Sequence, residues 1–526
     1  MENGSVKPTT LTLAFVLSLA LVVPTAAQIQ YPNPIKHVVI IVQENRSPDN
    51  LFGSNSPSNQ YYLPGADLAT SGMASTGSGT NKKVFSVPLI SIPLASIYNV
   101  GDSKPADDYN PDHSHPSWVK MCDLNKSGSC AMDGANHIPV YCDGNLPPGS
   151  NCPPAYPQYA YVQYVDVAPY FQIAAQYAYA NRMFQTNQGP SFPAHQILFG
   201  GTSQPGNGPE PTWFAAENAL LNGRLPNGAP NGCIGATAQQ KPPQGLTVQL
   251  IEPTPPYSES QTMFPCFNHT TLAEVLDGAK ITWTYYTPGQ GSLWSAPDAL
   301  EAVCVPNSAG TKCIGPDWTK HPRANGFVDV SPTDVLKDIP NCNLASVSWV
   351  IPGGLASDHA AITDGSGPSW VASIVNAIGN NTNCDVTNGQ SGYWYDTAIL
   401  ITWDDWGGWY DHVPPPPLPA AAPPEAASYE YGFRVPLMVV SAYTPLGMID
   451  NTVHDFGSVL RFVEDVFGGL GTIPPGTYAD SFASDDLSVF FQFSQPKART
   501  FQTIKAPLKA DYFINDKRPP SPPDED

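Results

Sequence analysis

Charged side chains are scarce in this sequence, and the basic ones are the scarcer kind. Only 13% of the 526 residues are charged, and 45 acidic residues against 24 Lys and Arg give a formal net charge of −21. Nucleic-acid phosphates are held by Lys and Arg, so this balance argues against a nucleic-acid partner. A low charged fraction combined with 58 prolines is typical of long ordered loops, not of a charge-rich disordered chain.

Long apolar runs are also missing, apart from Leu11–Val23 near the N-terminus. This run follows Lys7 and precedes the small residues Thr25-Ala26-Ala27, an order that predicts a secretory signal over residues 1–27. An uncleaved anchor is the alternative, although the run is short for a membrane span. We therefore expect a secreted or periplasmic protein without a stable membrane span after signal cleavage.

The ten cysteines lack the CxxC spacing that zinc sites use. They are scattered through loop-like sequence, which favours disulfides formed in an oxidising compartment. Sequence alone leaves their connectivity open. Pairing between neighbours would join Cys122 with Cys130, Cys142 with Cys152, and Cys304 with Cys313.

Two short apolar runs, 35–42 and 398–403, are predicted to be strands buried on both faces. Glu44-Asn45 follows the first run and Asp404-Asp405 follows the second, about 360 residues later. In open α/β sheets, sites lie beyond the carboxyl ends of the strands, so these two pairs are expected to converge. Four oxygen donors without Cys suit a hard or borderline divalent cation. The alternative is an Asp-rich turn that caps a strand.

Strand-like and helix-like segments alternate along the rest of the chain, with long insertions between them. This order predicts one α/β domain over 28–513, followed by a Pro-rich acidic tail over 514–526. Residues 54–110 show little periodic pattern and are expected to be an excursion over the surface. The other predicted elements are helices at 162–184, 270–277, 369–378 and 455–467, and strands at 280–286, 345–351 and 435–441.

Polar motifs in the predicted loops offer candidate chemistry, each with a structural alternative. His113 and His115 suit metal ligation, general acid catalysis or phosphate binding, or form a surface pair. Ser191 lies in a tight turn near a helix start, where backbone N–H groups favour an anion, or is one structural serine among many. Arg46 suits pairing with a carboxylate or a phosphate.

Taken together, the motifs resemble those of the bacterial phosphoesterase family, which contains phosphocholine-type and non-specific phospholipases C and respiratory-burst-inhibiting acid phosphatases. The resemblance implies an alkaline-phosphatase-like three-layer α/β sandwich with a central, mostly parallel sheet and one divalent metal ion (Ca, Mg, Mn or Zn). The motifs, in the family's order, are ENRSPDNLFG at 44–53, DHS at 112–114, MDG at 132–134, GPSFP at 189–193, SDH at 357–359 and DDWGGWYDHVPPP at 404–416.

Carried over motif by motif, the resemblance implies a role for each candidate residue. Ser191 would be both a metal ligand and the nucleophile, while His113 and His359 would bind phosphoryl oxygens or protonate the leaving group. Where many relatives have Asn-Arg this chain has Ala194-His195, so His195 is expected to replace that Arg. The implied metal ligands are Glu44, Asn45, Ser191, Asp404 and Asp405, and the implied substrate contacts are Arg46, His115 and His195.

Two hypotheses follow from these motifs. The first is an exported, metal-dependent phosphoric-ester hydrolase, a phospholipase C or an acid phosphatase, that acts through a phosphoserine on a phosphate ester. A phospholipid at a membrane surface is one candidate substrate. The second is a secreted binding protein that keeps the fold and the metal without turnover. The presence of Ser191 together with all four oxygen donors favours the enzyme.

Overall fold

The structure is a computed structural model that describes Met1 and residues 33–520, except for eleven internal segments. The predicted signal over 1–27 lies outside the described residues, apart from Met1. The internal segments left out are 96–108, 126–128, 143–152, 220–231, 235–246, 253–258, 291–294, 319–324, 388, 418–430 and 495–497.

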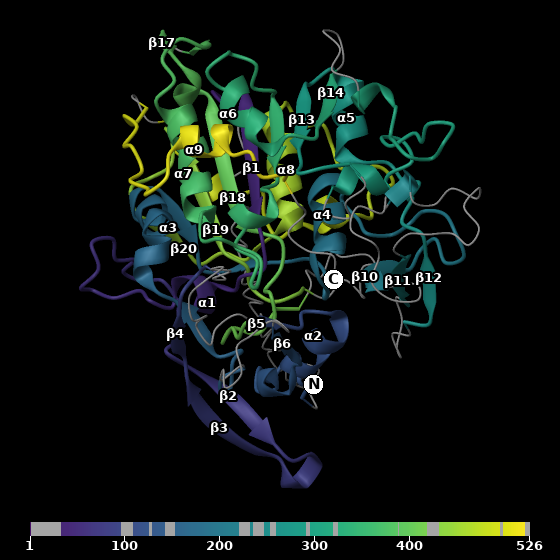
Figure 1. The fold of residues 1–526 in the computed structure, drawn as a ribbon, viewed down its shortest axis with the longest axis vertical. Coiled ribbons are helices and arrows are strands. Elements are labelled where there is room, and N and C mark those ends of the chain that lie inside the picture. The colour runs from purple at the N-terminus through teal and green to yellow at the C-terminus, as the bar shows by residue number, and fades with distance from the viewer. Residues whose placement is uncertain are drawn as a thin grey trace.

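An eight-stranded sheet forms the centre of the fold (Figure 1). Neighbouring strands are parallel except on either side of β19, which runs antiparallel to both of its neighbours, so the sheet is mostly parallel as predicted. In spatial order the strands are β14 (Gly326–Asp329), β13 (Trp283–Tyr286), β15 (Val347–Val350), β1 (His37–Gln43), β18 (Thr397–Trp403), β19 (Leu437–Ser441), β8 (Ala178–Ala180) and β20 (Met448–Asp450).

Two groups of helices cover opposite faces of this sheet (Figure 1). The resulting three layers confirm the predicted α/β class. One group contains α3 (Tyr164–Gln176), α6 (Val335–Asp338), α7 (Gly367–Gly379) and α9 (Ala510–Asn515); the other contains α4 (Ser191–Gly200), α5 (Leu272–Ala279) and α8 (Phe456–Val466).

The two central strands, β1 and β18, confirm the strands predicted from the apolar runs. Every residue of both strands is buried, because helices cover both faces of the sheet. The strands pair in parallel from His37 opposite Thr397 to Gln43 opposite Trp403. This register places the residues that follow the two strands next to each other.

Two predicted helices, 270–277 and 455–467, begin within one residue of the predicted start, each at a capping residue. Thr271 and Glu274 form a capping box at the start of α5, and Asp455 accepts a hydrogen bond from the Ser458 N–H at the start of α8. The helix predicted over 162–184 is wrong in its second half: α3 ends at Gln176, and β8 and β9 (Met183–Phe184) follow. A short buried apolar run has the same composition in a strand as in a helix, so periodicity did not separate them.

The predicted surface excursion contains a β-hairpin that the sequence analysis did not foresee. β2 (Ser71–Thr76) and β3 (Lys83–Pro88) pair antiparallel, and β4 (Ile90–Ile92) then pairs with β7 (Ala160–Val162). The hairpin projects from the lower end of the molecule (Figure 1). Two further short segments, β5 (Tyr109–Pro111) and β6 (Val140–Cys142), pair near its base, close to α2 (His115–Cys122).

Four disulfides link the described residues. Two of the predicted pairs, Cys122–Cys130 and Cys304–Cys313, are confirmed. The other two disulfides, Cys233–Cys266 and Cys342–Cys384, were not predicted, because they join residues 33 and 42 apart. Cys152 lies outside the described residues, so its pairing with Cys142 stays a prediction. None of the helices in the described part of the chain is long and apolar enough to span a membrane.

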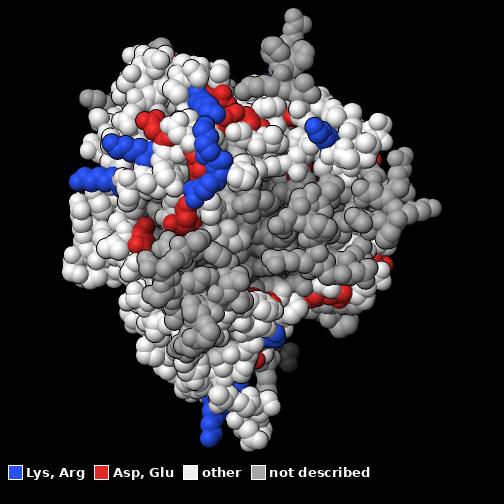
Figure 2. Space-filling model, in the orientation of Figure 1, with Lys and Arg blue, Asp and Glu red and all other residues white. Residues whose placement is uncertain are grey.

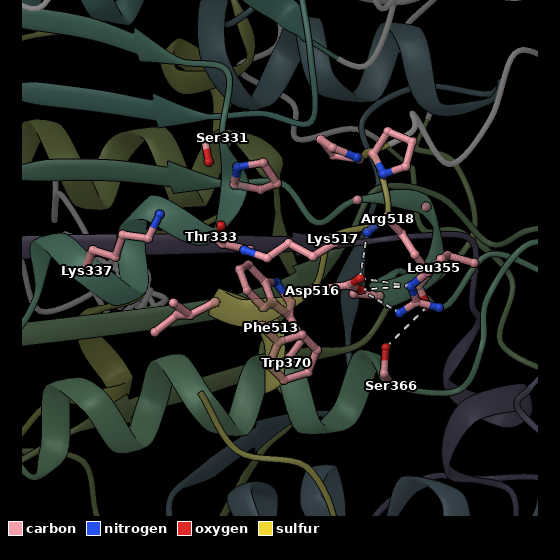
Figure 3. Close-up of a pocket in the computed structure, with 17 residues that line it drawn as sticks. Ser331, Thr333, Lys337, Leu355, Ser366, Trp370, Phe513, Asp516, Lys517 and Arg518 are labelled. Atoms are coloured by element: carbon pink, nitrogen blue, oxygen red, sulfur yellow. Dashed lines mark hydrogen bonds and ion pairs between the residues drawn. The ribbon is translucent and has the colours of Figure 1, made fainter. Parts of the chain in front are cut away.

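Contacts with the domain continue past the predicted boundary at 513. Phe513 packs against Trp370 of α7 with ring centroids 5.2 Å apart, and Arg518 reaches Asp364 at 3.0 Å. The segment forms one wall of a cavity of about 310 Å³ (Figure 3). Three basic side chains, Lys337, Lys517 and Arg518, line this cavity, and Lys337 and Arg518 pair with Asp residues.

A buried histidine links the end of the sheet to the C-terminal part of the chain. His454 Nε2 lies 2.9 Å from Asp450 Oδ1, and His454 Nδ1 lies 2.9 Å from Asp485 Oδ2. Burial opposes the charged imidazolium, but the hydrogen bonds to both carboxylates outweigh it and raise the pKa of His454 to about 9. The folded state therefore binds a proton that the unfolded chain releases near pH 6.5.

This linkage predicts that stability falls with rising pH. The contribution of His454 is fully present below about pH 6.5 and is lost by about pH 9, on the order of 3 kcal/mol in the free energy of unfolding. Urea unfolding at several pH values across this window measures it, and His454→Asn is expected to flatten the slope. A variant with the wild-type slope would contradict the assignment.

Candidate functional site

The four oxygen-bearing residues expected to converge lie together at the carboxyl ends of β1 and β18. Glu44, Asn45, Asp404 and Asp405 are all fully buried. The Asn45 N–H donates to Asp404 Oδ1 at 2.9 Å, so the two strand ends are joined directly. The adjacent parallel pairing of the strands is what brings these residues together.

A sharp backbone turn fixes how the two aspartates point. Asp404 Oδ1 accepts from the Asp405 N–H at 2.7 Å, and Asp405 Oδ1 accepts from the Gly407 N–H at 2.6 Å. Gly407 has a φ of +63°, and a Cβ there would lie 2.1 Å from the Asn45 carbonyl oxygen. Only glycine permits this approach. Asn45 itself has a φ of +59°, in the left-handed region that Asn tolerates better than most residues.

Helix α4 delivers two further side chains to the carboxylates. Ser191 is its first residue, and the Ser191 hydroxyl donates to Asp405 Oδ2 at 3.2 Å. His195 lies one turn later on the same face. His195 Nε2 lies 3.5 Å from Glu44 Oε1 and 3.7 Å from Asp404 Oδ2. The structure therefore places His195 among the predicted metal ligands, a position that sequence reasoning did not foresee.

The buried carboxylates of this cluster favour a bound cation. Burial lowers the pKa of His195 to about 4, although Asp404 acts in the opposite direction, so the imidazole is neutral beside the carboxylates. Buried carboxylates are costly without a partner charge. Asn45 Oδ1 and Asp404 Oδ2 have no hydrogen-bond partner within the described part of the chain.

The donor set fits a divalent metal ion. Ligand atoms of Glu44, His195 and Asp404 lie within 4.8 Å of one another. Oxygen donors with one neutral imidazole suit Mg²⁺, Mn²⁺ or Zn²⁺, and Ca²⁺ less well because it prefers oxygen ligands alone. A second acidic and sulfur-containing group, Asp298 with Cys304 and Cys313, offers no thiolates because the two cysteines form a disulfide.

Two of the predicted histidines meet above the strand ends. The rings of His113 and His359 lie 5.8 Å apart and edge to face. His113 Nδ1 donates to the Pro111 carbonyl at 3.1 Å, so Nε2 accepts from Asn45 Nδ2 at 2.8 Å. His359 Nδ1 donates to the Ala360 carbonyl at 2.6 Å, which leaves Nε2 as the basic nitrogen of the neutral ring.

His115 and Arg46 occupy different surroundings. His115 Nδ1 contacts the Glu259 carboxylate, and Nε2 lies 3.3 Å from Gln188 Oε1, just before the turn that carries Ser191. The Arg46 guanidinium donates to the Asp358 carbonyl at 2.7 Å and to Asn50 Oδ1 at 3.1 Å. These contacts favour a supporting role for Arg46, and substrate contact by either residue stays a prediction.

Sequence reasoning missed Asp358 as a residue of the site. Its Oδ2 accepts from the Tyr170 hydroxyl at 2.9 Å and from Trp403 Nε1 at 3.0 Å. Burial raises the pKa of Asp358 to about 6, although Arg46 and these donors act in the opposite direction. Asp358 therefore ties the loop that carries His359 to the end of β18. Its place directly before His359 was the available signal.

Asp411 and His412, which follow Asp404-Asp405 in the same motif, have contacts that support the loop. The buried Arg434 donates to both Asp411 oxygens, from Nε at 2.8 Å and from Nη2 at 3.0 Å. His412 Nδ1 lies 2.7 Å from Asp49 Oδ2. These residues form an ion-pair network that fastens the Asp404 loop to α1 (Pro48–Phe52).

Comparison with known proteins agrees with the family resemblance found in the sequence motifs. A family model named Phosphoesterase matches residues 35–470. Phospholipase C A of Mycobacterium tuberculosis (strain ATCC 25618 / H37Rv) is 24% identical over 90% of this chain and 80% of its own. Non-hemolytic phospholipase C of Burkholderia pseudomallei (strain K96243) is 30% identical over 31% of this chain and 25% of its own.

Solved structures resemble the chain only distantly. A protein in the alkaline phosphatase superfamily from Vibrio parahaemolyticus aligns at 11% identity over 64% of this chain and 66% of its own, with a TM-score of 0.29. The α/β class follows from the central sheet and the helices on its two faces.

The cluster predicts that Asp404→Asn weakens binding of divalent cations. Mutating a residue that only hydrogen-bonds a metal ligand lowers metal affinity by roughly 10–100-fold. Removing the charge of a ligand itself is expected to lower the affinity at least as much. Calorimetric titration of chelator-treated protein with Mg²⁺, Mn²⁺, Zn²⁺ or Ca²⁺ measures it. Asp334→Asn, which changes a partly exposed Asp beside Lys337, is the matched control. Equal affinities in the two variants would remove Asp404 from the ligand set.

Proposed function

This chain belongs to the Phosphoesterase family, and we propose that this phosphoric-ester hydrolase depends on a divalent metal ion and forms a covalent phosphoserine on Ser191. The observation that carries the proposal is the hydrogen bond of 3.2 Å from the Ser191 hydroxyl to Asp405 Oδ2. A serine at a helix start, beside buried carboxylates, is held in one orientation at a place where an anion is favoured.

The proposed metal ligands are Glu44, Asn45, Ser191, Asp404 and Asp405, with His195 as a further donor. A divalent cation held there would lower the pKa of the serine hydroxyl and offset the negative charge of the phosphoryl group. The side chains of the chain itself supply the geometry. Asp405 orients the Ser191 oxygen, and the turn at Gly407 holds Asp405 in place.

The reaction then has two steps with balanced atoms. Ser191 Oγ gives its proton to Asp405 Oδ2 and attacks phosphorus; the bond from Oγ to phosphorus forms, and the bond from phosphorus to the leaving oxygen breaks. His359 or His113, in its protonated form, gives the leaving oxygen its proton. Water next gives one proton to that histidine and attacks the phosphoserine; the phosphate product leaves, and Asp405 returns its proton to Ser191 Oγ. The two rings lie 5.8 Å apart, so both can face one phosphoryl group.

Phosphodiesters are the favoured substrate class. The relatives named phospholipase C support a substrate such as a phospholipid. Small phosphomonoesters are the second candidate, since the same nucleophile and cation serve both. Export is part of the proposal, because the four disulfides of the described residues suit an oxidising, secreted or periplasmic setting. A binding protein without turnover is the alternative.

Ser191→Ala is expected to reduce the turnover of p-nitrophenyl phosphorylcholine and of p-nitrophenyl phosphate by roughly 10³-fold or more, because the nucleophile is lost. Chelation of the wild type should have a similar effect that added divalent metal reverses. The release of p-nitrophenol measures both, and the preferred substrate separates a phospholipase C from a phosphatase.

The matched control is Ser203→Ala, which removes a buried serine hydroxyl beyond the other end of α4. This variant should retain activity. A Ser191→Ala enzyme with wild-type turnover would exclude the phosphoserine. A wild type that hydrolyses neither ester with any of the four metals would favour the binding protein.

A further inference from the structure

The projecting hairpin has an apolar outer face. Met73 pairs with Ser86 and Ser75 pairs with Val84, so Met73 and Val84 lie on the same side of the two strands. Met73 is 42% exposed and Val84 is 48% exposed. Pro88 and Ile90 continue the same alternation and are also exposed. We call Met73, Val84, Pro88 and Ile90 the outer face.

The composition of the outer face is unusual for a solvated strand. An antiparallel pair with one face on a core normally turns polar or charged side chains to water. Here the other exposed positions on this side are Ser71 and Ser86, while Ser75 is buried, and none of these positions is charged. The opposite face, with Ala74 and Val87, is buried. Exposed apolar side chains that gather in this way mark a contact surface.

The hairpin is joined rigidly to the loop that carries the site. The Met73 N–H donates to the Tyr410 hydroxyl at 3.2 Å, and the Tyr159 hydroxyl donates to the Met73 carbonyl at 2.7 Å. Trp406, in the same loop as Asp404, packs edge to face against the His113 ring, with ring centroids 6.3 Å apart. The outer face and Ser191 therefore lie at the same end of the molecule, and a surface that binds the outer face is held at that end.

Charge distinguishes the hairpin from the rest of the chain. No Asp or Glu occurs from residue 68 to residue 101, although the chain as a whole carries −21. Lys82 and Lys83 lie at the hairpin tip; Lys82 pairs with Asp123 and Asp133, and Lys83 is exposed. In Figure 2 the projecting lower end is mainly white with blue atoms. An anionic surface would repel most of this protein but not this segment.

We propose that the outer face docks on a phospholipid bilayer and so presents the site to lipid substrate. Apolar side chains enter the boundary between headgroups and acyl chains, while Lys83 stays among the headgroup phosphates. The inference rests on the proposed function, because the bilayer supplies the phosphodiester. It adds the interfacial surface, which the site residues do not provide.

The test compares the variant Met73→Ser/Val84→Ser with wild type by co-sedimentation with vesicles. The vesicles contain phosphatidylcholine alone or with phosphatidylglycerol, and binding is measured at 4 °C. We expect the variant to lose at least tenfold in vesicle affinity and in turnover of vesicle phosphatidylcholine. Its turnover of soluble p-nitrophenyl phosphorylcholine should stay within about twofold of wild type, because neither residue touches the site.

The matched control is Val330→Ser/Leu446→Ser, which changes two other exposed apolar residues and should bind vesicles as wild type does. Equal vesicle binding by wild type and the hairpin variant would overturn the proposal, as would a wild type that binds neither vesicle. A wild-type dimer that the hairpin substitutions convert to monomers would assign the face to a second copy instead. Failure of the proposed function is separate: it would appear as no turnover of the soluble ester with vesicle binding intact.

Discussion

Buried negative charge at the ends of two adjacent strands is the constraint on which this structure depends. β1 and β18 pair over seven residues, so Glu44 and Asp404 leave the sheet side by side and away from water. Like charges in a dry environment repel strongly unless a cation or a proton joins them. Burial lowers the pKa of the nearest imidazole, that of His195, to about 4, so this ring is neutral and does not offset the charge. A bound divalent ion would resolve this conflict and would link the fold to the proposed chemistry.

The few buried arginines stabilise the surroundings of the site instead of its centre. Arg434 binds Asp411 through two hydrogen bonds, and Arg46 donates to the Asp358 carbonyl while its guanidinium lies 5.1 Å from the centre of the Trp409 ring. Asp358 in turn accepts from Trp403 at the end of β18. These contacts hold the loops at one geometry without neutralising the ligands. A charge-poor chain thus keeps its basic residues where they position loops.

The site and the hairpin share one end of the fold, and this arrangement suits an enzyme whose substrate is part of a surface. The aromatic cluster in the DDWGGWY motif packs between them: Trp406 contacts His113, and Tyr410 bonds the hairpin backbone. These rings are buried, so they act as the mechanical connection and not as an exposed platform. The cavity beside Trp370 and Phe513 is a separate feature, in which Lys337 and Arg518 pair with Asp residues.

The sequence by itself determined the two central strands, the capped helices α5 and α8 and the convergence of Glu44-Asn45 with Asp404-Asp405. Local patterns of burial and capping are sufficient for these, and a parallel sheet brings strand ends to one edge. Only the tertiary structure decided that 178–184 forms strands, that His195 lies beside the carboxylates, and that the hairpin exposes Met73. Each of these depends on contacts between segments far apart in the chain, and such contacts override local propensity.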